Sequence, residues 1–285
     1  MQITVLKDNQ AMRDGTIPGH GLAMLVEAEG IRVLFDTGPD DTIIANAATL
    51  GVRLDPLDAI VLSHGHYDHT GGLAAVLAAV GPGPVKVVAH PGVFDSTYSG
   101  PGPGQLRPIG MPLEREAYEA LGAVFELSEM PVALGDVLMT TGHVPPLHPL
   151  RRAGLWRNRE AVPYPDDFRD DCSLVARLGG SSALLTGCAH AGLRNILYKA
   201  QTIVPDGPPR VVVGGLHLGA ADDDEIREVA AEAYSLGVRT ILPCHCTGDR
   251  AAALLQECFA GKVVAIGTGS IVTFGPHGKV AVTTK

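Results

Sequence analysis

Three histidines and an aspartate lie within one short segment, at His64, His66, Asp68 and His69. So many imidazole and carboxylate groups are costly to place together unless something binds them. Divalent first-row metals take neutral imidazole nitrogen and carboxylate oxygen readily. One ion would struggle to use all four groups, whereas two ions a few ångströms apart can divide them. We therefore expect one or two divalent metal ions here, zinc first, with manganese and iron also compatible.

Further chemistry-bearing residues follow strand-like segments in the second half of the chain. They are Cys188 and His190 in one turn, His217 after a pair of glycines, and His245 in a third turn. In open α/β sheets, groups at the carboxyl ends of strands line the site. His217 is expected to bind substrate or donate a proton; the alternative is a hydrogen-bonded turn histidine.

Short β-branched runs bounded by glycine, proline, aspartate or asparagine alternate with helical segments, which predicts an α/β layered fold. The expected strands are residues 3–6, 22–27, 31–35, 58–62, 85–89, 174–178, 183–186, 211–213, 240–242, 263–266 and 271–274. The expected helices are residues 73–80, 113–121, 193–202, 225–235 and 250–259. The first histidine segment directly follows the strand at 58–62, which places it at that strand's carboxyl end.

The middle of the chain is expected to be an irregular lid, an insertion at about residues 91–171, with loops at 91–112 and 141–171. Its second loop carries Arg151, Arg152, Arg157 and Arg159. Arginine forks pair with phosphate and carboxylate groups, and Trp156 between them could cover a flat ring. We expect Arg152, Trp156 and Arg157 to bind a small anionic substrate; the alternative is a solvated face.

Composition excludes several classes of protein. The chain has 285 residues, 46% of them hydrophobic, so it can bury a sizeable core and is not intrinsically disordered. A net charge of −9 disfavours nucleic acid and anionic membranes as partners. No apolar run is long enough for a membrane span, and the start of the chain does not read as a signal peptide. The five cysteines form no regular framework and fit reduced thiols, so we expect a cytoplasmic protein. We expect a single domain over residues 1–285.

The His-x-His-x-Asp-His pattern of residues 64–69 resembles the hallmark of the metallo-β-lactamase superfamily. The resemblance implies a four-layer αβ/βα sandwich with a metal site at the shared edge of two sheets. It also implies that His64 and His66 serve one metal, and that Asp68 and His69 serve the other.

The same resemblance assigns roles to residues outside that segment. Asp36, in Phe-Asp-Thr-Gly, matches the aspartate that braces the histidine loop. His245 is the expected late ligand of the second metal. His190 is preferred over His143 as the third ligand of the first metal, which leaves His143 as a pocket residue. Cys188 stands where the superfamily usually has a bridging aspartate, and we assign it a supporting role.

Two other cysteines flank the late histidine. If that segment is extended, Cys244 and Cys246 point away from His245, so both are expected to be core thiols. His20, His90 and His277 have no partners nearby in sequence and are expected to be structural or exposed.

Cys188, His217 and the residues around His245 also resemble a subgroup that includes the dihydropterin ribofuranosylaminobenzene 5′-phosphate synthases. We therefore expect a metal-dependent, hydrolase-like enzyme acting on a small anionic molecule, such as a phosphorylated pterin- or ribose-linked compound. A metal-activated water would be the nucleophile, oriented by Asp68. Two alternatives stay open: a condensation of the synthase kind, and a non-catalytic metal-binding ligand sensor.

Overall fold

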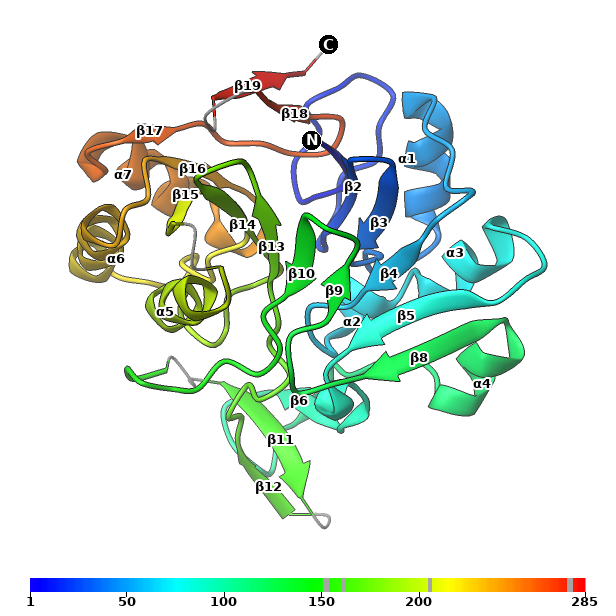
Figure 1. Ribbon diagram of the computed structural model, residues 1–285. Coiled ribbons are helices and arrows are strands. Elements are labelled where there is room, and N and C mark those ends of the chain that lie inside the picture. Colours follow the sequence, from blue (N-terminus) through cyan, green and yellow to red (C-terminus); the bar gives the residue numbers. More distant parts are fainter. Residues whose placement is uncertain (151–153, 160–161, 205–206, 276–278, 285) are drawn as a thin grey trace.

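The chain folds around a first sheet of mixed direction (Figure 1). The computed structural model describes residues 1–284 apart from 151–153, 160–161, 205–206 and 276–278, so His277 lies outside the described residues. The first sheet has the order β19 (Val280–Thr283), β18 (Ile271–Phe274), β1 (Gln2–Lys7), β2 (Ala23–Ala28), β3 (Ile31–Phe35), β4 (Ala59–Val61), β5 (Val85–Ala89) and β8 (Ala123–Leu127). Strands β3, β4, β5 and β8 run parallel, so their carboxyl ends share one edge.

A second sheet packs against the first. Its order is β17 (Lys262–Val263), β16 (Thr240–Pro243), β15 (Pro209–Gly214), β14 (Ser182–Thr186), β13 (Leu174–Arg177), β10 (Leu138–Thr140) and β9 (Ala133–Leu134). Strands β14 to β17 are parallel to one another. Their carboxyl ends therefore also meet along one edge, as the expected α/β pattern requires.

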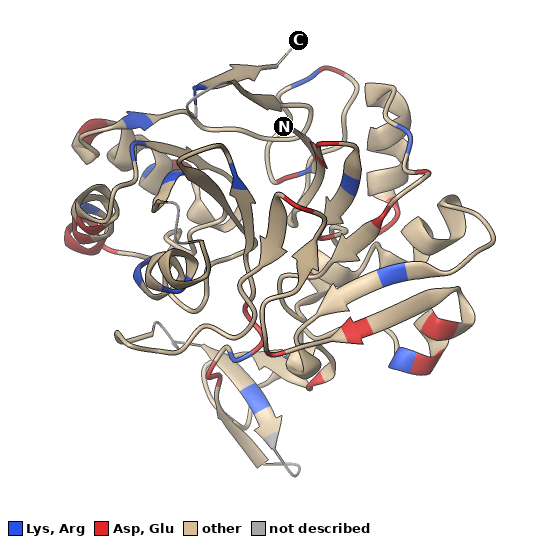
Figure 2. Ribbon diagram, viewed as in Figure 1, with Lys and Arg blue, Asp and Glu red and all other residues tan. Residues whose placement is uncertain are grey.

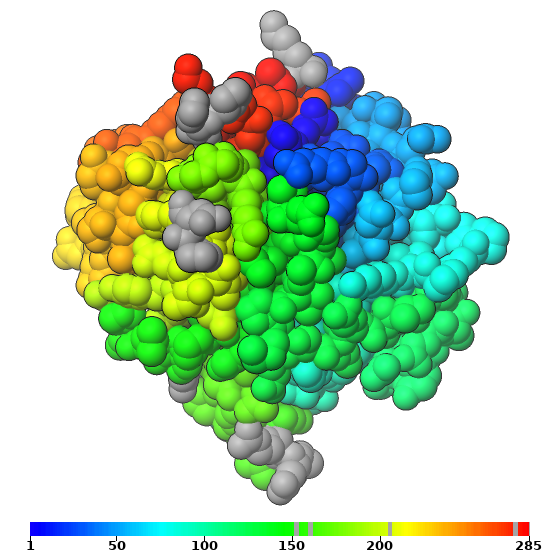
Figure 3. Space-filling model, viewed as in Figure 1, coloured from blue at the N-terminus to red at the C-terminus, as the bar shows by residue number. Residues whose placement is uncertain are grey.

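Apolar side chains between the two sheets form the central core. Phe35 and Val61 come from the first sheet and Leu185 and Val213 from the second, and all are fully buried. Helices α1 (Thr42–Leu50), α3 (Leu73–Ala79) and α4 (Arg115–Ala120) cover the outer face of the first sheet, and α5 (Leu193–Ile203), α6 (Asp223–Ser235) and α7 (Asp249–Cys258) cover the second. The expected four-layer αβ/βα sandwich is confirmed, and the space-filling view shows its two halves packed side by side (Figure 3).

The middle of the chain is more regular than expected. A small sheet of order β12 (Val162–Pro165), β11 (Leu155–Arg159), β6 (Thr97–Ser99) and β7 (Arg107–Pro108) projects from the lower end of the molecule in Figure 1. The prediction of loops at 91–112 and 141–171 is wrong for these strands. Their prolines lie on the edge strands β7 and β12, where a missing backbone donor is tolerated, so proline content misled the assignment.

Several short elements complete the fold. They are α2 (Tyr67–Thr70) within the histidine segment and the 3₁₀ turns η1 (Pro91–Phe94) and η2 (His245–Thr247). None of the helices in the described part of the chain combines the length and apolar character that a bilayer crossing needs.

Candidate metal centre

The histidine loop is held against the rest of the site by backbone contacts at Gly65. The Gly65 amide donates to Oδ2 of Asp170 at 2.8 Å. A Cβ on Gly65 would lie only 2.2 Å from the carbonyl oxygen of Val93, so a larger residue would push the loop away. Asp170 is a support that sequence reasoning missed, since it lies more than a hundred residues from the loop.

Asp36 braces the loop from the carboxyl end of β3. Its Oδ1 accepts the backbone amide of Ser63 at 2.7 Å, and its Oδ2 accepts the Ser63 hydroxyl and lies 2.7 Å from Nδ1 of His69. Ser63 Oγ also lies 2.9 Å from Nδ1 of His64. The contacts at Nδ1 of His64 and of His69 hold these two rings in place and leave their Nε2 atoms to bind a metal. Metal-binding histidines are commonly held by a supporting carboxylate in this way.

Three histidines form what we call the first donor group: His64, His66 and His190. Nε2 of His64 lies 3.0 Å from Nδ1 of His66, and the His190 ring is centred 4.9 Å from each of the other two rings. The Phe168 ring stacks on His190 at 4.7 Å.

Burial keeps these imidazoles neutral. It lowers the pKa of His66 to about 4 and holds those of His64 and His190 well below the usual value. Neither ring nitrogen of His190 has a hydrogen-bond partner among the described residues, although both are buried. Such orphaned nitrogens are rare unless a ligand occupies them, and the neutral ring is the form that binds a metal.

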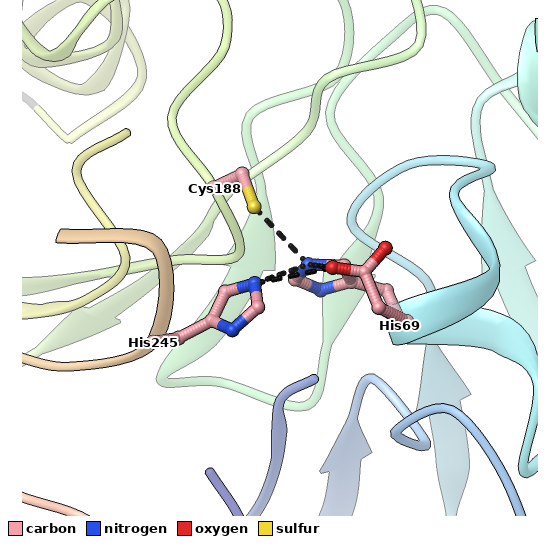
Figure 4. A group of neighbouring side chains, drawn as sticks. His69, Cys188 and His245 are labelled. Carbon is pink, nitrogen blue, oxygen red and sulfur yellow. Dashed lines mark hydrogen bonds and ion pairs between the residues drawn. The ribbon is translucent and has the colours of Figure 1, made fainter. Parts of the chain in front are cut away.

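Four further residues form the second donor group: Asp68, His69, Cys188 and His245. Their ligand atoms lie within 4.8 Å of one another, and all four are buried. Figure 4 shows the side chains of His69, Cys188 and His245 pointing toward one point from different segments of the chain. Nε2 of His69 lies 3.1 Å from both Cys188 Sγ and His245 Nε2, and Asp68 Oδ2 lies 3.3 Å from the latter.

Charge in the second donor group is strongly coupled. Burial opposes the charged form of His245, but negative charge on Cys246 and Asp68 outweighs it and raises the pKa of His245 to about 9. Burial likewise opposes ionisation of Asp68, yet His69, His20 and His245 hold its pKa well below the usual value. A carboxylate surrounded by imidazoles and a thiol is a donor set that suits a divalent cation.

Cys188 has a more direct position than the supporting role assigned from sequence. Its sulfur belongs to the second donor group and also lies within 4.8 Å of the ligand atoms of His64 and His190. It follows β14, where Gly187 allows close approach: a Cβ there would lie 2.1 Å from Ser63 Oγ. A thiol in this position makes Cys188 a candidate ligand in addition to its expected supporting role.

Three residues near the second donor group were missed. Asn9 Oδ1 accepts from Nδ1 of His245 at 2.9 Å, and Asp8 Oδ1 accepts the His245 amide at 2.7 Å. His20 is exposed, as expected, but its contact with the site was missed: its Nε2 lies 3.1 Å from Asp68 Oδ2. The turn after β1 therefore supplies part of the site, which no local sequence signal indicates.

His217 lies beside the first donor group, at the end of β15. Its ring is centred 4.3 Å from that of His190, and both line a cavity of about 550 Å³. The cavity lies between the loop at His148 and helices α5 and α6, next to the donor groups. His217 thus lines the cavity at its border with the first donor group.

Of the expected arginine clamp, the structure describes the side chain of Arg157, and this residue is not free to bind an anion. Arg157 is only 1% exposed and pairs with Asp95, Asp166 and Asp170, which together raise its pKa although burial lowers it. The prediction that Arg157 binds substrate is therefore wrong for this arrangement: its charge is already neutralised. Arg151 and Arg152 lie outside the described residues.

Two other candidates for substrate binding lie in different surroundings. Trp156 is half-buried in β11, and its Nε1 donates to the carbonyl of Gly100 at 3.0 Å. Nδ1 of His143 donates to the carbonyl of Arg169 at 3.2 Å, and its ring lies 6.0 Å from that of His90. In the parts of the chain that are described, His143 belongs to none of the candidate metal-binding groups, whereas His190 does.

The two cysteines around His245 differ in their surroundings. Cys244 is buried in the apolar core, as expected. The expectation for Cys246 is wrong: its sulfur lies within 4.8 Å of ligand atoms of Cys188 and His217. The reason is the 3₁₀ turn η2, which breaks the strand alternation on which the prediction depended.

Backbone at the site adopts unusual conformations. Asp36, Ala189, His217 and His245 all have positive φ values, between 51° and 60°. Non-glycine residues in this left-handed region cost energy and cluster at functional sites. The turns after β3, β14, β15 and β16 therefore carry strain at the points where they present donor atoms.

Comparison with known proteins agrees with this arrangement. A family model described as the metallo-β-lactamase superfamily matches residues 16–267. A 7,8-dihydropterin-6-methyl-4-(β-D-ribofuranosyl)-aminobenzene-5′-phosphate synthase of Methanocaldococcus jannaschii is 29% identical over 90% of each chain. The crystal structure of Tm1679, described as a metal-dependent hydrolase of the β-lactamase superfamily, is 30% identical over 96% of this chain and 99% of its own, with a TM-score of 0.84. YhfI from Bacillus subtilis, a metallo-β-lactamase fold protein, shares the fold at 13% identity over 95% of this chain and 98% of its own, with a TM-score of 0.58. The chain therefore belongs to the metallo-β-lactamase superfamily.

Proposed function

We propose that the protein is a metal-dependent enzyme that acts on a small anionic substrate where the two sheets meet. The observation that carries this proposal is the convergence of the second donor group, whose buried ligand atoms lie within 4.8 Å of one another. Its sulfur, nitrogen and oxygen donors fit zinc first, and manganese or iron as alternatives. A bound divalent metal supplies Lewis-acid polarisation and makes water a stronger acid.

The surrounding residues prepare the site for that role. Asp36 fixes the ring of His69, and Asn9 fixes the ring of His245, each through its Nδ1. Rings held in this way do not have to be ordered when a ligand arrives, which supports both affinity and geometry. The carboxylate of Asp68 would also orient the attacking water beside the donor atoms.

The cavity supports a substrate with a flat, donor-rich ring. Leu193, Leu216 and Val229 give it apolar walls, and carboxylates of α6, among them Glu228, line its outer part. Figure 2 shows acidic residues on α6. Carboxylates accept hydrogen bonds from an amino-substituted heterocycle such as a pterin, while a phosphate on the same molecule would turn toward the donor groups.

The charges of the cavity and of the chain support a small anionic substrate, and the cysteines support a reducing compartment. The cavity arginine, Arg194, is paired with Glu232, so within the described lining the metal ions would be the main attraction for an anionic group. The net charge of −9 favours a small molecule over nucleic acid. The five cysteines are free thiols, which supports a reducing compartment such as the cytoplasm.

Hydrolysis is the first candidate reaction and condensation the second. The likeness to Tm1679 supports the first, and the likeness to the Methanocaldococcus jannaschii synthase supports the second. In either reaction His217 can hand a proton to a leaving group. Its ring lines the cavity beside the first donor group.

The proposal is tested on protein loaded with zinc or manganese and assayed for metal content. One assay follows cleavage of bis(p-nitrophenyl) phosphate. The other follows, by mass spectrometry, condensation of a dihydropterin 6-methyl diphosphate with ribofuranosylaminobenzene 5′-phosphate, in which the new bond to the methyl carbon replaces the carbon–oxygen bond and diphosphate leaves. We expect turnover in one assay, lost in His69→Ala and kept in Asp58→Asn, an exposed carboxylate bonded to the Arg32 amide. Fully loaded protein that is inactive in both assays would favour a non-catalytic metal-binding sensor.

A further inference from the structure

The ends of β14, β15 and β16 bring a further set of metal-binding atoms together. Cys188, His217 and Cys246 offer ligand atoms that lie within 4.8 Å of one another. We propose that these residues, here called the third donor group, form a sulfur-rich position for a thiophilic divalent ion such as Zn²⁺ or Cd²⁺. This goes beyond the proposed function, because it concerns which metals the protein takes whatever reaction it catalyses.

Specific contacts hold the Cys246 sulfur in place. The backbone amide of His217 donates to Cys246 Sγ at 3.2 Å, and the same sulfur lies 3.7 Å from the carbonyl oxygen of Cys188. Together the two contacts fix the position of the sulfur, a soft ligand of the kind that zinc and cadmium take. His217 thus contributes twice to the group: its backbone amide contacts the Cys246 sulfur, and its side chain supplies the imidazole.

Glycine at the end of β15 makes this approach possible. A Cβ on Gly215 would lie 2.6 Å from Cys246 Sγ and 3.4 Å from Cys188 Cα. It would also lie 2.4 Å from the carbonyl oxygen of Gly187, so no side chain fits there without moving backbone. The two sulfur-bearing turns can therefore close on each other only around this glycine.

The surroundings of Cys246 differ from those of a structural thiol. Cys244, two residues earlier, is buried among apolar side chains of the central core. Cys246 is partly exposed, and its neighbours are a second thiol and an imidazole. Nδ1 of that imidazole, on His217, is buried and lacks a hydrogen-bond partner in the described residues. A buried nitrogen without a partner carries a desolvation cost that a bound cation would remove.

The composition of the group indicates what it would bind. Thiolates select soft ions such as Zn²⁺ over Mg²⁺ or Mn²⁺. Two cysteines and one histidine leave one of the four zinc positions open, as in catalytic rather than structural sites. His217 also lines the 550 Å³ cavity, so the group borders a space that can hold water or a ligand. Cys188 is shared with the second donor group, so its sulfur would bridge neighbouring ions.

The test uses the full chain, Co²⁺ or Cd²⁺ as the probe, and the sulfur-to-metal charge-transfer absorbance in the ultraviolet. Cys246→Ser should bind one ion fewer per chain and lose about half of the absorbance, because one of two sulfur ligands is gone. Cys258→Ser is the matched control: this partly exposed thiol on α7 should leave both readings unchanged. His64→Ala should lose an ion from the first donor group but keep the absorbance that depends on Cys246.

A second measurement needs no variant. Alkylation of the unmodified protein, read by mass spectrometry, should be slowed several-fold at Cys246 by Cd²⁺ and unaffected at Cys258. Full metal content and absorbance in folded Cys246→Ser, or equal alkylation of Cys246 with and without Cd²⁺, would overturn the third donor group. Either result would leave the first and second groups, and with them the proposed function, intact.

Discussion

Oδ2 of Asp36 lies 2.7 Å from Nδ1 of His69, and both side chains are completely buried. Both oxygens of this carboxylate accept hydrogen bonds from the loop it braces, through the amide and the hydroxyl of Ser63. The aspartate at the end of β3 thus fixes the ring of His69, which lies in α2 after the next strand and belongs to the second donor group.

Replacing Asp36 with asparagine should weaken metal binding without unfolding the chain. The amide nitrogen of asparagine cannot accept, so one of the donors facing Asp36 loses its partner. Loss of such a support lowers metal affinity about 10–100-fold. Competition with a coloured chelator measures the change, with Asp58→Asn as the control; an unchanged affinity in Asp36→Asn would remove the bracing role.

His190, rather than His143, is expected to complete the first donor group. His190→Ala should reduce the metal content by one ion per chain, because its orphaned nitrogens lie among those of His64 and His66. His143→Ala should retain full content, since its ring instead bonds the carbonyl of Arg169. Elemental analysis after dialysis decides between them, and loss from the His143 variant alone would reverse the assignment.

Arg157 is expected to stabilise the fold rather than bind substrate. Arg157→Leu would leave Asp166 and Asp170 buried without their partner, which costs about 3–5 kcal/mol of the free energy of unfolding. Arg169→Leu breaks only a partly exposed pair with Asp167 and should cost about 0–1 kcal/mol. Urea unfolding measures both, and equal losses would contradict the distinction.

Asp171 is expected to make the metal-free protein less stable as pH rises. Burial, with the charges of Asp170 and Cys246, raises its pKa to about 8 from 3.8, although the Ala191 amide opposes this. Between these values the folded chain holds a proton that the unfolded chain has released, so the free energy of unfolding falls with rising pH.

Asp171→Asn removes that proton linkage and keeps an oxygen for the Ala191 amide. The variant should therefore gain stability over the parent progressively between pH 3.8 and about 8. Asp167→Asn is the control, because Arg169 lowers that pKa and no gain is expected in this range. Urea unfolding over a pH series of chelator-treated protein gives both differences; a constant difference for Asp171→Asn would refute the linkage.

The layered fold and the loop at His64 could be read from sequence because their signals are local. Apolar periodicity gave β3 and β5 with their observed bounds, and closely spaced histidines marked the end of β4. Asp36 could be placed only through a family resemblance, since its contact with His69 spans 33 residues.

The remaining parts of the site depend on long-range packing. Asp8 and Asn9 meet His245 across more than 230 residues, and His20 meets Asp68 only because the turn after β1 folds over the site. Arg157 looked like a free cation because the sequence does not show that the chain turns back after β11 and places Asp166 and Asp170 against it. The expectation that Cys246 is a core thiol was wrong because it assumed the alternating side-chain directions of a strand, whereas residues 245–247 form a 3₁₀ turn.

Each donor group draws on segments that lie far apart along the chain. His64 and His66 follow β4 whereas His190 follows β14, and Asp68 and His69 meet Cys188 and His245. A protein divided between β10 and β13 would therefore have neither the first nor the second donor group complete in either fragment. Metal would favour reassembly of two such fragments, and a chelator would oppose it. Bound metal would therefore contribute to the association of the two halves of the sandwich.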